Sequence, residues 1–359
     1  MFKIYQLHIF KKFLLKYFYF NLIFLSLIII MGILEEISFF KDINQGIFYP
    51  LILTFLNAPD TLFEVIPFIC LLSSQFLFFD LFNTKEMDLL KRNGLSNFKL
   101  IRDLFICGLF IGIFNILIFY NISAILKFNY SNIKNNFSND NKYLAMVNES
   151  GLWIKDNSEN KSLIIKARKI DKNFLHEVII NEFDKNFDLI RIIRSKKIDI
   201  EQNNWLIYNP EIVVNNIREL TLDKINLTTN FNKETINSFF SDLSTLDIIS
   251  LYNSKENLKK LGYSADEISI HLMKLYIMPI YYGILIVLAS TIMFYTKQKN
   301  SLIFNLIVGV MVSVLLYYLT FIFNAMGNSG RISPQMSVFF PVFLLFLISC
   351  TGIVRINEK

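Results

Sequence analysis

The stretch LLKYFYFNLIFLSLIIIMGIL, residues 14–34, is apolar along nearly its whole length. A helix needs about 20 predominantly apolar residues to cross roughly 30 Å of membrane hydrocarbon, and this stretch meets that requirement. It is also longer than the apolar core of a cleavable signal, and Glu35, Glu36 and Ile37 follow it where small residues would mark a cleavage site. We therefore expect a retained membrane helix near the N-terminus.

Five further runs of similar length and composition follow along the chain. They are residues 62–82, 104–126, 272–294, 302–324 and 338–354. The overall composition agrees, because 53% of the 359 residues are hydrophobic, 37 are Phe and only 18% are charged. The sequence therefore predicts an α-helical membrane protein with six transmembrane helices, three on each side of a long hydrophilic block.

The hydrophilic block covers residues 127–270 and is rich in strand patterns. Apolar and polar residues tend to alternate there, as in half-buried antiparallel strands, and turn-forming residues separate the segments. The predicted strands are Tyr143–Val147, Leu152–Lys155, Leu163–Ala167, Leu175–Phe183, Phe187–Ile200, Trp205–Tyr208 and Ile212–Val214. We expect an inserted all-β domain, either a sandwich or a jelly-roll-like module.

These patterns divide the chain into four parts. Residues 1–126 form the first transmembrane half, 127–243 the β domain, 244–270 a helical connector and 271–359 the second transmembrane half. In the connector, Ser264 and Glu267 have the spacing of a capping box, which predicts the start of the helix that continues into the fourth span.

The distribution of Lys and Arg predicts the orientation in the membrane. Both termini, residues 83–102 and the loop after the fourth span are rich in these residues, whereas the opposite short loops hold only Lys41 and Arg331. Short loops rich in Lys and Arg stay in the cytoplasm, and long loops are translocated largely regardless of charge. We therefore expect cytoplasmic termini and an extracytoplasmic β domain.

The segment FNTKEMDLLKRNGLSNFKL, residues 82–100, places a dense patch of charge between the second and third spans. Asn83 is a possible N-cap with Glu86 at the third helical position, and Gly94 is a suitable helix stop. We expect a short amphipathic helix over about residues 83–94, with Met87, Leu89 and Leu90 as its apolar stripe. It is either a solvated connector or a docking helix for a cytoplasmic partner.

Several kinds of chemistry find no support in the sequence. The chain has no phosphate-binding loop of the G-x-x-x-x-G-K-[ST] type, so it cannot hydrolyse ATP alone. The three histidines, His8, His176 and His271, lie far apart, and the three cysteines fall inside the predicted spans. We therefore expect no catalytic residue, no metal and no cofactor, and no intramembrane enzyme.

Charged and polar residues within the spans fit structural roles. The charged ones sit near the ends of the spans, where they can reach the interface, so that no proton relay crosses the membrane. They are Lys16, Glu64, Asp80, Arg102, Asp103 and Lys274. For the uncharged polar residues at depth, we expect hydrogen bonds between helices. These are Ser73, Ser74, Gln75, Asn115 and Asn305.

Three stretches, together with their order, resemble a known family. They are EMDLLKRNGLS at 86–96, YLAMVNESGLWIKD at 143–156 and LDIISLYNSKENLKKLGYSADEISIHLMKLYIMPI at 246–280. With three spans on each side of the β domain, the chain resembles the LptF/LptG permease family of the lipopolysaccharide-export ABC transporter over essentially its whole length. The last two stretches are more similar to the G-type subunit.

The resemblance implies a multi-pass protein of the bacterial inner membrane that works with several partners. These are an F-type permease in a heterodimer, two copies of a cytoplasmic ATPase that binds the ATP, a periplasmic bridge protein joined by strand addition, and lipopolysaccharide, with no nucleic acid. The residues implied for coupling to the ATPase are Glu86, Asp88, Lys91, Arg92 and Gly94. Lys41 and Arg331, near the external ends of spans, are the residues implied for binding lipid phosphates.

Two alternatives stay open at this point. Glu35 and Glu36 are acidic where the family is basic, which keeps alive an ABC permease for another cargo, such as a lipoprotein or a different glycolipid. The other alternative is a membrane-anchored assembly or sensor scaffold. That role would need a cytoplasmic output, and the segments outside the spans leave no room for such a domain.

Overall fold

The structure of the chain is a computed structural model. It describes residues 3–41, 46, 48–137, 152–158, 161–171, 173–184, 187–214, 217–218, 223–231, 233, 236, 242–260, 263–296 and 302–357. The chain divides into two compact units, one made of Met1–Lys127 and Asp266–Lys359 and the other of Phe128–Ala265. The predicted strand Tyr143–Val147 and the basic loop after the fourth span lie outside the described residues, as does the side chain of Asn305.

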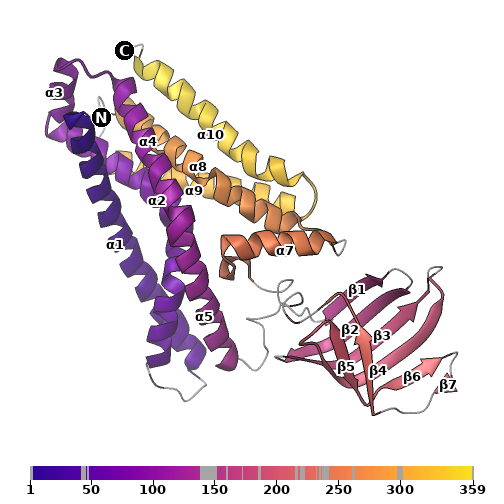
Figure 1. The fold of residues 1–359 in the computed structure, drawn as a ribbon. Coiled ribbons are helices and arrows are strands. Elements are labelled where there is room, and N and C mark those ends of the chain that lie inside the picture. Colours follow the sequence, from indigo (N-terminus) through magenta and orange to yellow (C-terminus); the bar gives the residue numbers. More distant parts are fainter. Residues whose placement is uncertain are drawn as a thin grey trace. The chain divides into compact units, whose positions relative to one another are not determined.

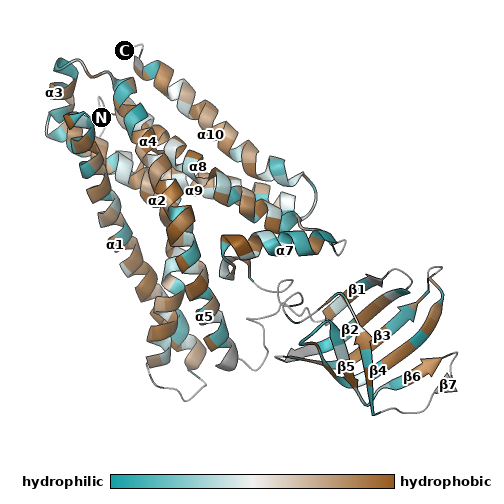
Figure 2. Ribbon diagram, in the orientation of Figure 1, coloured by the Kyte–Doolittle hydropathy of each residue, from teal (hydrophilic) through white to brown (hydrophobic). Residues whose placement is uncertain are grey.

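The first unit is α-helical (Figure 1). Its elements are α1 (Ile4–Phe40), α2 (Phe48–Asn83), α3 (Glu86–Arg92), α4 (Asn97–Phe114), the π-helix η1 (Asn115–Tyr120), the start of α5 (Asn121–Phe137), α8 (Asp266–Thr296), α9 (Leu302–Asn328) and α10 (Pro334–Asn357). Among the residues that the structure describes, six helical stretches are long and apolar enough to cross a membrane, with α4, η1 and α5 together forming the third. Figure 2 shows apolar residues along most of their length. The predicted spans are confirmed.

Proline residues lie inside three of these helices. They are Pro59 and Pro67 in α2, Pro279 in α8 and Pro341 in α10. Proline has no backbone N–H, so each leaves one carbonyl in the preceding turn without its usual helical donor and favours a bend. These three helices pack together, and the apolar cluster between them and α9 contains Leu71, Leu285, Leu316 and Val342.

Small residues allow α4 and α8 to approach closely. Gly108 and Gly112, four residues apart on α4, face Gly283 and Pro279 of α8. Small residues at this spacing let the backbones of two membrane helices come into direct contact, which favours dispersion attraction and excludes lipid. The glycine pair therefore brings one helix of each transmembrane half into close contact.

Polar side chains at depth partly follow the sequence-based expectation. Asn115 donates from its Nδ2 to the Tyr17 hydroxyl at 3.4 Å, which joins the third span to α1. At the other end of the π-helix, the Tyr120 hydroxyl and His271 Nε2 lie 2.9 Å apart and link it to α8. Ser74 differs from the expectation, because its hydroxyl donates to the Cys70 carbonyl of its own helix.

The second unit contains an antiparallel sheet of eight described strands (Figure 1). The strands are β1 (Leu152–Ser158), β2 (Lys161–Asp171), β3 (Phe174–Phe183), β4 (Leu189–Asp199), β5 (Asn204–Tyr208), β6 (Glu211–Val214), β7 (Ile217–Arg218) and β8 (Lys224–Thr228). They pair in the order β1-β2-β3-β4-β5-β8, and β6 pairs with β4 and β7. The predicted fold class, a six-helix membrane protein with an inserted all-β domain, is confirmed.

The sheet buries one face, as the alternation predicted. Its core includes Ile165, Ile180, Ile193 and Trp205, each 0% exposed. Trp205 donates from its indole N–H to the Phe231 carbonyl at 2.7 Å, so the polar edge of the ring is satisfied inside the core. The short helix η2 (Leu243–Thr245) and α7 (Ile248–Lys260) complete this unit.

Candidate functional site

The helix α3 is the short charged helix expected between the second and third spans. It is shorter than the predicted 83–94, and its N-cap differs from the prediction, because α2 continues through Asn83. Thr84 extends that end by donating its backbone N–H and its hydroxyl to the Asp80 carbonyl. Lys85 then makes the turn with a positive φ of 57°, so that Glu86 is the first residue of α3 rather than the third.

The C-terminal end of α3 follows the prediction. Gly94 has a φ of 81°, a conformation that glycine adopts without a steric penalty. Its N–H donates to the Lys91 carbonyl at 2.9 Å, and Leu95 N–H donates to the Leu90 carbonyl at 3.1 Å. This pair of bonds is a Schellman motif, which satisfies the last carbonyls of a helix and directs the chain onward, here into α4.

One side of α3 is tied to the first helix. The Lys12 ammonium lies 2.5 Å from Glu86 Oε1, and His8 Nε2 lies 3.2 Å from Glu86 Oε2. The hydrogen bond from Lys12 is the main reason that the pKa of Glu86 lies below its usual value. Both carboxylate oxygens of Glu86 are therefore engaged within the chain.

The same side of α3 also contacts the interior and α8. Met87 is only 1% exposed, so it anchors the short helix by packing. The Lys91 ammonium lies 5.8 Å from the centre of the Phe294 ring, within the range of a cation–π contact. Phe294 packs in turn on Phe78 and Phe82 of α2. We call Glu86, Met87 and Lys91 the anchoring side of α3.

The opposite side of α3 faces outward. Asp88 and Arg92 are exposed, and Leu89 keeps 56% of its surface accessible. Of the predicted apolar stripe Met87, Leu89 and Leu90, Met87 is buried, Leu90 is half-buried and Leu89 is exposed. We call Asp88, Leu89 and Arg92 the outer side of α3. An exposed leucine between an acid and a base is a feature that a partner protein can recognise.

Further polar contacts fasten the start of α1 to its neighbours. Gln6 donates from Nε2 to Asp103 Oδ2 at 2.8 Å, and Asp103, on α4, has a side chain only 2% exposed. The Lys16 ammonium lies 3.6 Å from Asp80 Oδ2 on α2. The sequence analysis took Lys12 as a signal of orientation and Lys16 also as a charge at a span end, and the contacts show that Lys12 pairs with Glu86 and Lys16 with Asp80.

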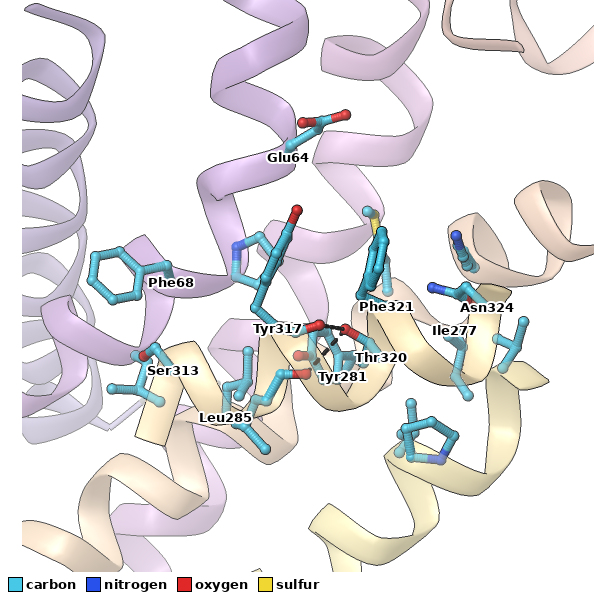
Figure 3. Close-up of a pocket in the computed structure, with 18 of the residues that line it drawn as sticks. Glu64, Phe68, Ile277, Tyr281, Leu285, Ser313, Tyr317, Thr320, Phe321 and Asn324 are labelled. Atoms are coloured by element: carbon cyan, nitrogen blue, oxygen red, sulfur yellow. Dashed lines mark hydrogen bonds between the residues drawn. The ribbon is translucent and has the colours of Figure 1, made fainter. Parts of the chain in front are cut away.

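A cavity of about 420 Å³ lies between four membrane helices (Figure 3). Phe68 of α2, Tyr281 and Leu285 of α8, and Tyr317 and Phe321 of α9 are among its lining residues, and α10 contributes Pro341. Most of the lining is apolar, with hydroxyl and amide groups at a few points. A cavity of this kind can hold an apolar chain and still orient a polar group.

Two charged residues line this cavity. They are Glu64 of α2 and Lys274 of α8, which the sequence analysis treated only as separate charges near the ends of spans. Glu64 and Lys274 come from different helices and both line the same cavity. An ionisable group at membrane depth that faces a cavity is a candidate for ligand binding. The sequence could not show that the two residues share one cavity.

The two residues expected to bind lipid phosphates are both on the surface. Lys41 follows the last residue of α1, and Arg331 follows Gly330 in the turn between α9 and α10. Neither residue is among those that line the cavity. Among the described residues, no group of three or more His, Cys, Asp or Glu side chains could hold a metal ion.

A comparison with protein-family models identifies the family of this chain. The model for "Lipopolysaccharide export system permease LptF/LptG" matches residues 7–355, which is nearly the whole sequence and includes both α3 and the cavity. The chain belongs to the LptF/LptG family. A search of curated proteins found no match. The LptF/LptG family places the chain in the inner membrane as a permease for lipopolysaccharide export, and the match does not separate the two subunit types.

Two features of the described residues stand out in this LptF/LptG chain. The helix α3 is tied to α1 and packed through Met87 on one side, and Asp88, Leu89 and Arg92 are exposed on the other. A mostly apolar cavity lies between α2, α8, α9 and α10.

Proposed function

We propose that this LptF/LptG chain is one permease subunit of an ABC transporter that extracts lipopolysaccharide from the inner membrane. A separate cytoplasmic ATPase binds α3 and supplies the energy. The β domain passes the lipid to a periplasmic bridge protein. The observation that carries the proposal is the two-sided build of α3. Glu86 and Met87 tie one side to α1 and to the interior, and Leu89 on the other side keeps 56% of its surface accessible beside the exposed Asp88.

The outer side of α3 is the proposed docking surface for the ATPase. Leu89 supplies an apolar contact, and Asp88 and Arg92 lie one residue before it and three after it. The remaining coupling residues act differently from the sequence-based expectation. Glu86 and Lys91 hold α3 on α1 and α8, and Gly94 sets its end. We propose that they transmit the movement rather than touch the ATPase.

The proposed partners follow from the family. The chain pairs with a second LptF/LptG permease, with the chain acting as the G-type subunit and its partner as the F-type. Both termini and α3 face the cytoplasm, where the ATPase is, and the β domain faces the periplasm. The positive-inside distribution of Lys and Arg supports this orientation.

The cavity is the proposed place where part of the lipid rests during extraction. Its apolar lining fits acyl chains, and Lys274 fits an anionic group such as a phosphate. Lys41 and Arg331, exposed beyond the ends of α1 and α9, are proposed to meet the phosphates as the lipid leaves the membrane. Glu64, which lines the same cavity as Lys274, would disfavour a cargo with many phosphates at this point, which leaves other glycolipids as an alternative cargo.

Reconstitution tests the proposal directly. The chain is produced with its cognate second permease, ATPase and bridge protein, purified in mild detergent and placed in liposomes that contain lipopolysaccharide. We expect the ATPase to co-purify and lipopolysaccharide to move to the bridge protein only when ATP is hydrolysed. If the complex forms but moves a lipoprotein or another glycolipid instead, the proposed cargo is wrong and the rest of the proposal stands. Failure to bind any ATPase would overturn the proposal.

Photo-crosslinking tests the role of the cavity. A photoreactive amino acid at Tyr317 or Phe321, both on the cavity lining, is expected to capture lipopolysaccharide in the reconstituted complex. The same amino acid at Phe110 is the control, because Phe110 is 62% exposed on α4 and does not line the cavity. Equal capture at all three positions would show contact with bulk lipid rather than a cargo site.

A further inference from the structure

The first helix carries basic side chains that face acids on other helices. His8, Lys12 and Lys16 follow one another at intervals of four residues, so they lie along one side of α1. His8 and Lys12 contact Glu86 of α3, and Lys16 contacts Asp80 of α2. We call His8 and Lys12, together with Glu86, the α1–α3 latch.

The latch has the geometry of a specific link. The side chains of Lys12 and Glu86 are 22% and 29% exposed, so the pair is shielded from much of the solvent. The two oxygens of Glu86 take separate partners one turn apart on α1, which fixes both the position of α3 along α1 and its rotation. A single exposed ion pair would not define both.

The latch connects α3 to a helix that is not its neighbour along the chain. The backbone connects α3 directly to α2 and α4, and Glu86 joins it to α1. A push on the outer side of α3 therefore reaches α2 and α4 through the backbone, and Glu86 gives it a direct route to α1 in addition to the packing of α1 on α2. The hydrogen bond from Gln6 to Asp103 also ties the start of α1 to α4.

We propose that His8 and Lys12 are positioning residues that make α1 a third helix driven by α3. The inference rests on the proposed function, because it assumes that an ATPase moves α3. Within that function, it assigns to the start of the first helix a role in energy transfer that its charge pattern alone does not suggest.

Charge exchange in the full complex tests the proposal. Lys12→Glu and Glu86→Lys each place like charges together, and the double variant restores an opposite pair with its order reversed. We expect each single variant to lower the lipid released per ATP hydrolysed by at least about fivefold, the lower end of usual coupling effects between sites. We expect the double variant to recover most of that ratio. Lys11→Glu is the matched control, because Lys11 is exposed on the neighbouring position of α1.

The readout separates coupling from stability. A latch that only stabilises the fold would lower the yield and melting temperature of the complex, but the complexes that form would keep the normal ratio of lipid to ATP. The proposal fails if the single variants keep the ratio of the Lys11→Glu control, or if the double variant stays as impaired as they are.

A distance measurement decides the proposal without the cargo. Spin labels are placed on Leu15→Cys of α1 and Asn93→Cys after α3, both exposed positions, in a chain with Cys350→Ser. In complexes with the wild-type latch, we expect the distance between the two labels to be the same with ATP bound and without nucleotide. In Glu86→Gln complexes, we expect that distance to change with nucleotide. A wild-type distance that changes would overturn the latch. ATP hydrolysis without lipid release would contradict the proposed cargo alone.

Discussion

A Cβ atom added to Gly112 of α4 would lie 2.3 Å from the Cα of Pro279 in α8. No side chain fits at that distance, so the two backbones are in contact because position 112 has none. One turn earlier, a Cβ on Gly108 would lie 3.1 Å from the Cα of Gly283. The contact joins a helix of the first transmembrane half to a helix of the second, and it depends on the absence of a Cβ atom at Gly108 and at Gly112.

Replacing Gly112 with Leu should separate α4 from α8. Overpacking in a close-packed interior costs about 1–3 kcal/mol, and here a backbone rather than a flexible side chain must move. We expect a lower melting temperature in detergent, with the smaller Gly112→Ala in between. Gly46→Ala is the control, because a Cβ at Gly46 meets nothing within 4 Å. A Gly112→Leu chain that melts with the control would contradict the close contact.

Replacing Gly94 with Ala tests the end of α3 by a purely conformational change. A Cβ at Gly94 meets no atom within 4 Å, so the cost comes from the positive φ of 81°. A left-handed conformation costs an ordinary residue about 1–2 kcal/mol, and Asn tolerates it better than Ala. We expect faster hydrogen exchange at the amides of α3 in Gly94→Ala and a smaller change in Gly94→Asn. Equal exchange in the two variants would argue against the Schellman motif.

Truncation of the two apolar residues on α3 should have opposite effects. Met87→Ala leaves a hole beneath the helix and should cost about 2–5 kcal/mol of stability. Leu89→Ala, on the outer side, should leave the melting temperature nearly unchanged but weaken ATPase binding about tenfold, which corresponds to ~1.4 kcal/mol. Thermal unfolding of the chain and titration with the ATPase measure the two quantities. Loss of stability in Leu89→Ala would place Leu89 in the interior.

The sequence was sufficient for the membrane helices and for the strands β1 to β6 because both depend on local patterns, whereas the short strands β7 and β8 were not predicted. A run of about 20 apolar residues has few alternatives to a spanning helix. In the β domain, the alternation that predicted strands around Ile165 and Ile180 is the same alternation that buries them in the sheet. The stop at Gly94 was also local, since a positive φ is a property of one residue.

The contacts of α3 could not be predicted because they depend on helix rotation and on distant residues. Lys12 and Glu86 are 74 positions apart, and hydropathy does not say which side of α1 faces which neighbour. Three apolar residues in a helix as short as α3 fit several rotations, so the apolar stripe did not show that Met87 is buried and Leu89 exposed. The cavity could not be predicted for the same reason, because four helices contribute to its lining and no single segment of sequence shows its shape.

Acid should weaken the β domain through one buried carboxylate. Glu182 is 1% exposed, and burial opposes its ionisation, but hydrogen bonds from Lys161 and Arg191 outweigh burial and lower its pKa below 4.5. A group with a lowered folded-state pKa stabilises the fold above its unfolded pKa, and this stabilisation is lost as the pH falls through the folded-state value. We therefore expect the β domain to lose stability below about pH 4.5.

The two tryptophans allow the acid-induced loss of β-domain stability to be measured in the full chain. Trp153 and Trp205 are the only tryptophans of the sequence, and both lie in the β domain, so thermal melts followed by tryptophan fluorescence report on that domain. Glu182→Gln should melt lower than wild type at pH 7 and flatten the decline between pH 5 and pH 3, because the titrating group is gone. Glu177→Gln is the control, because Glu177 pairs with Arg168 at 60% exposure. If Glu182→Gln and Glu177→Gln follow the same pH profile, another group governs the acid response.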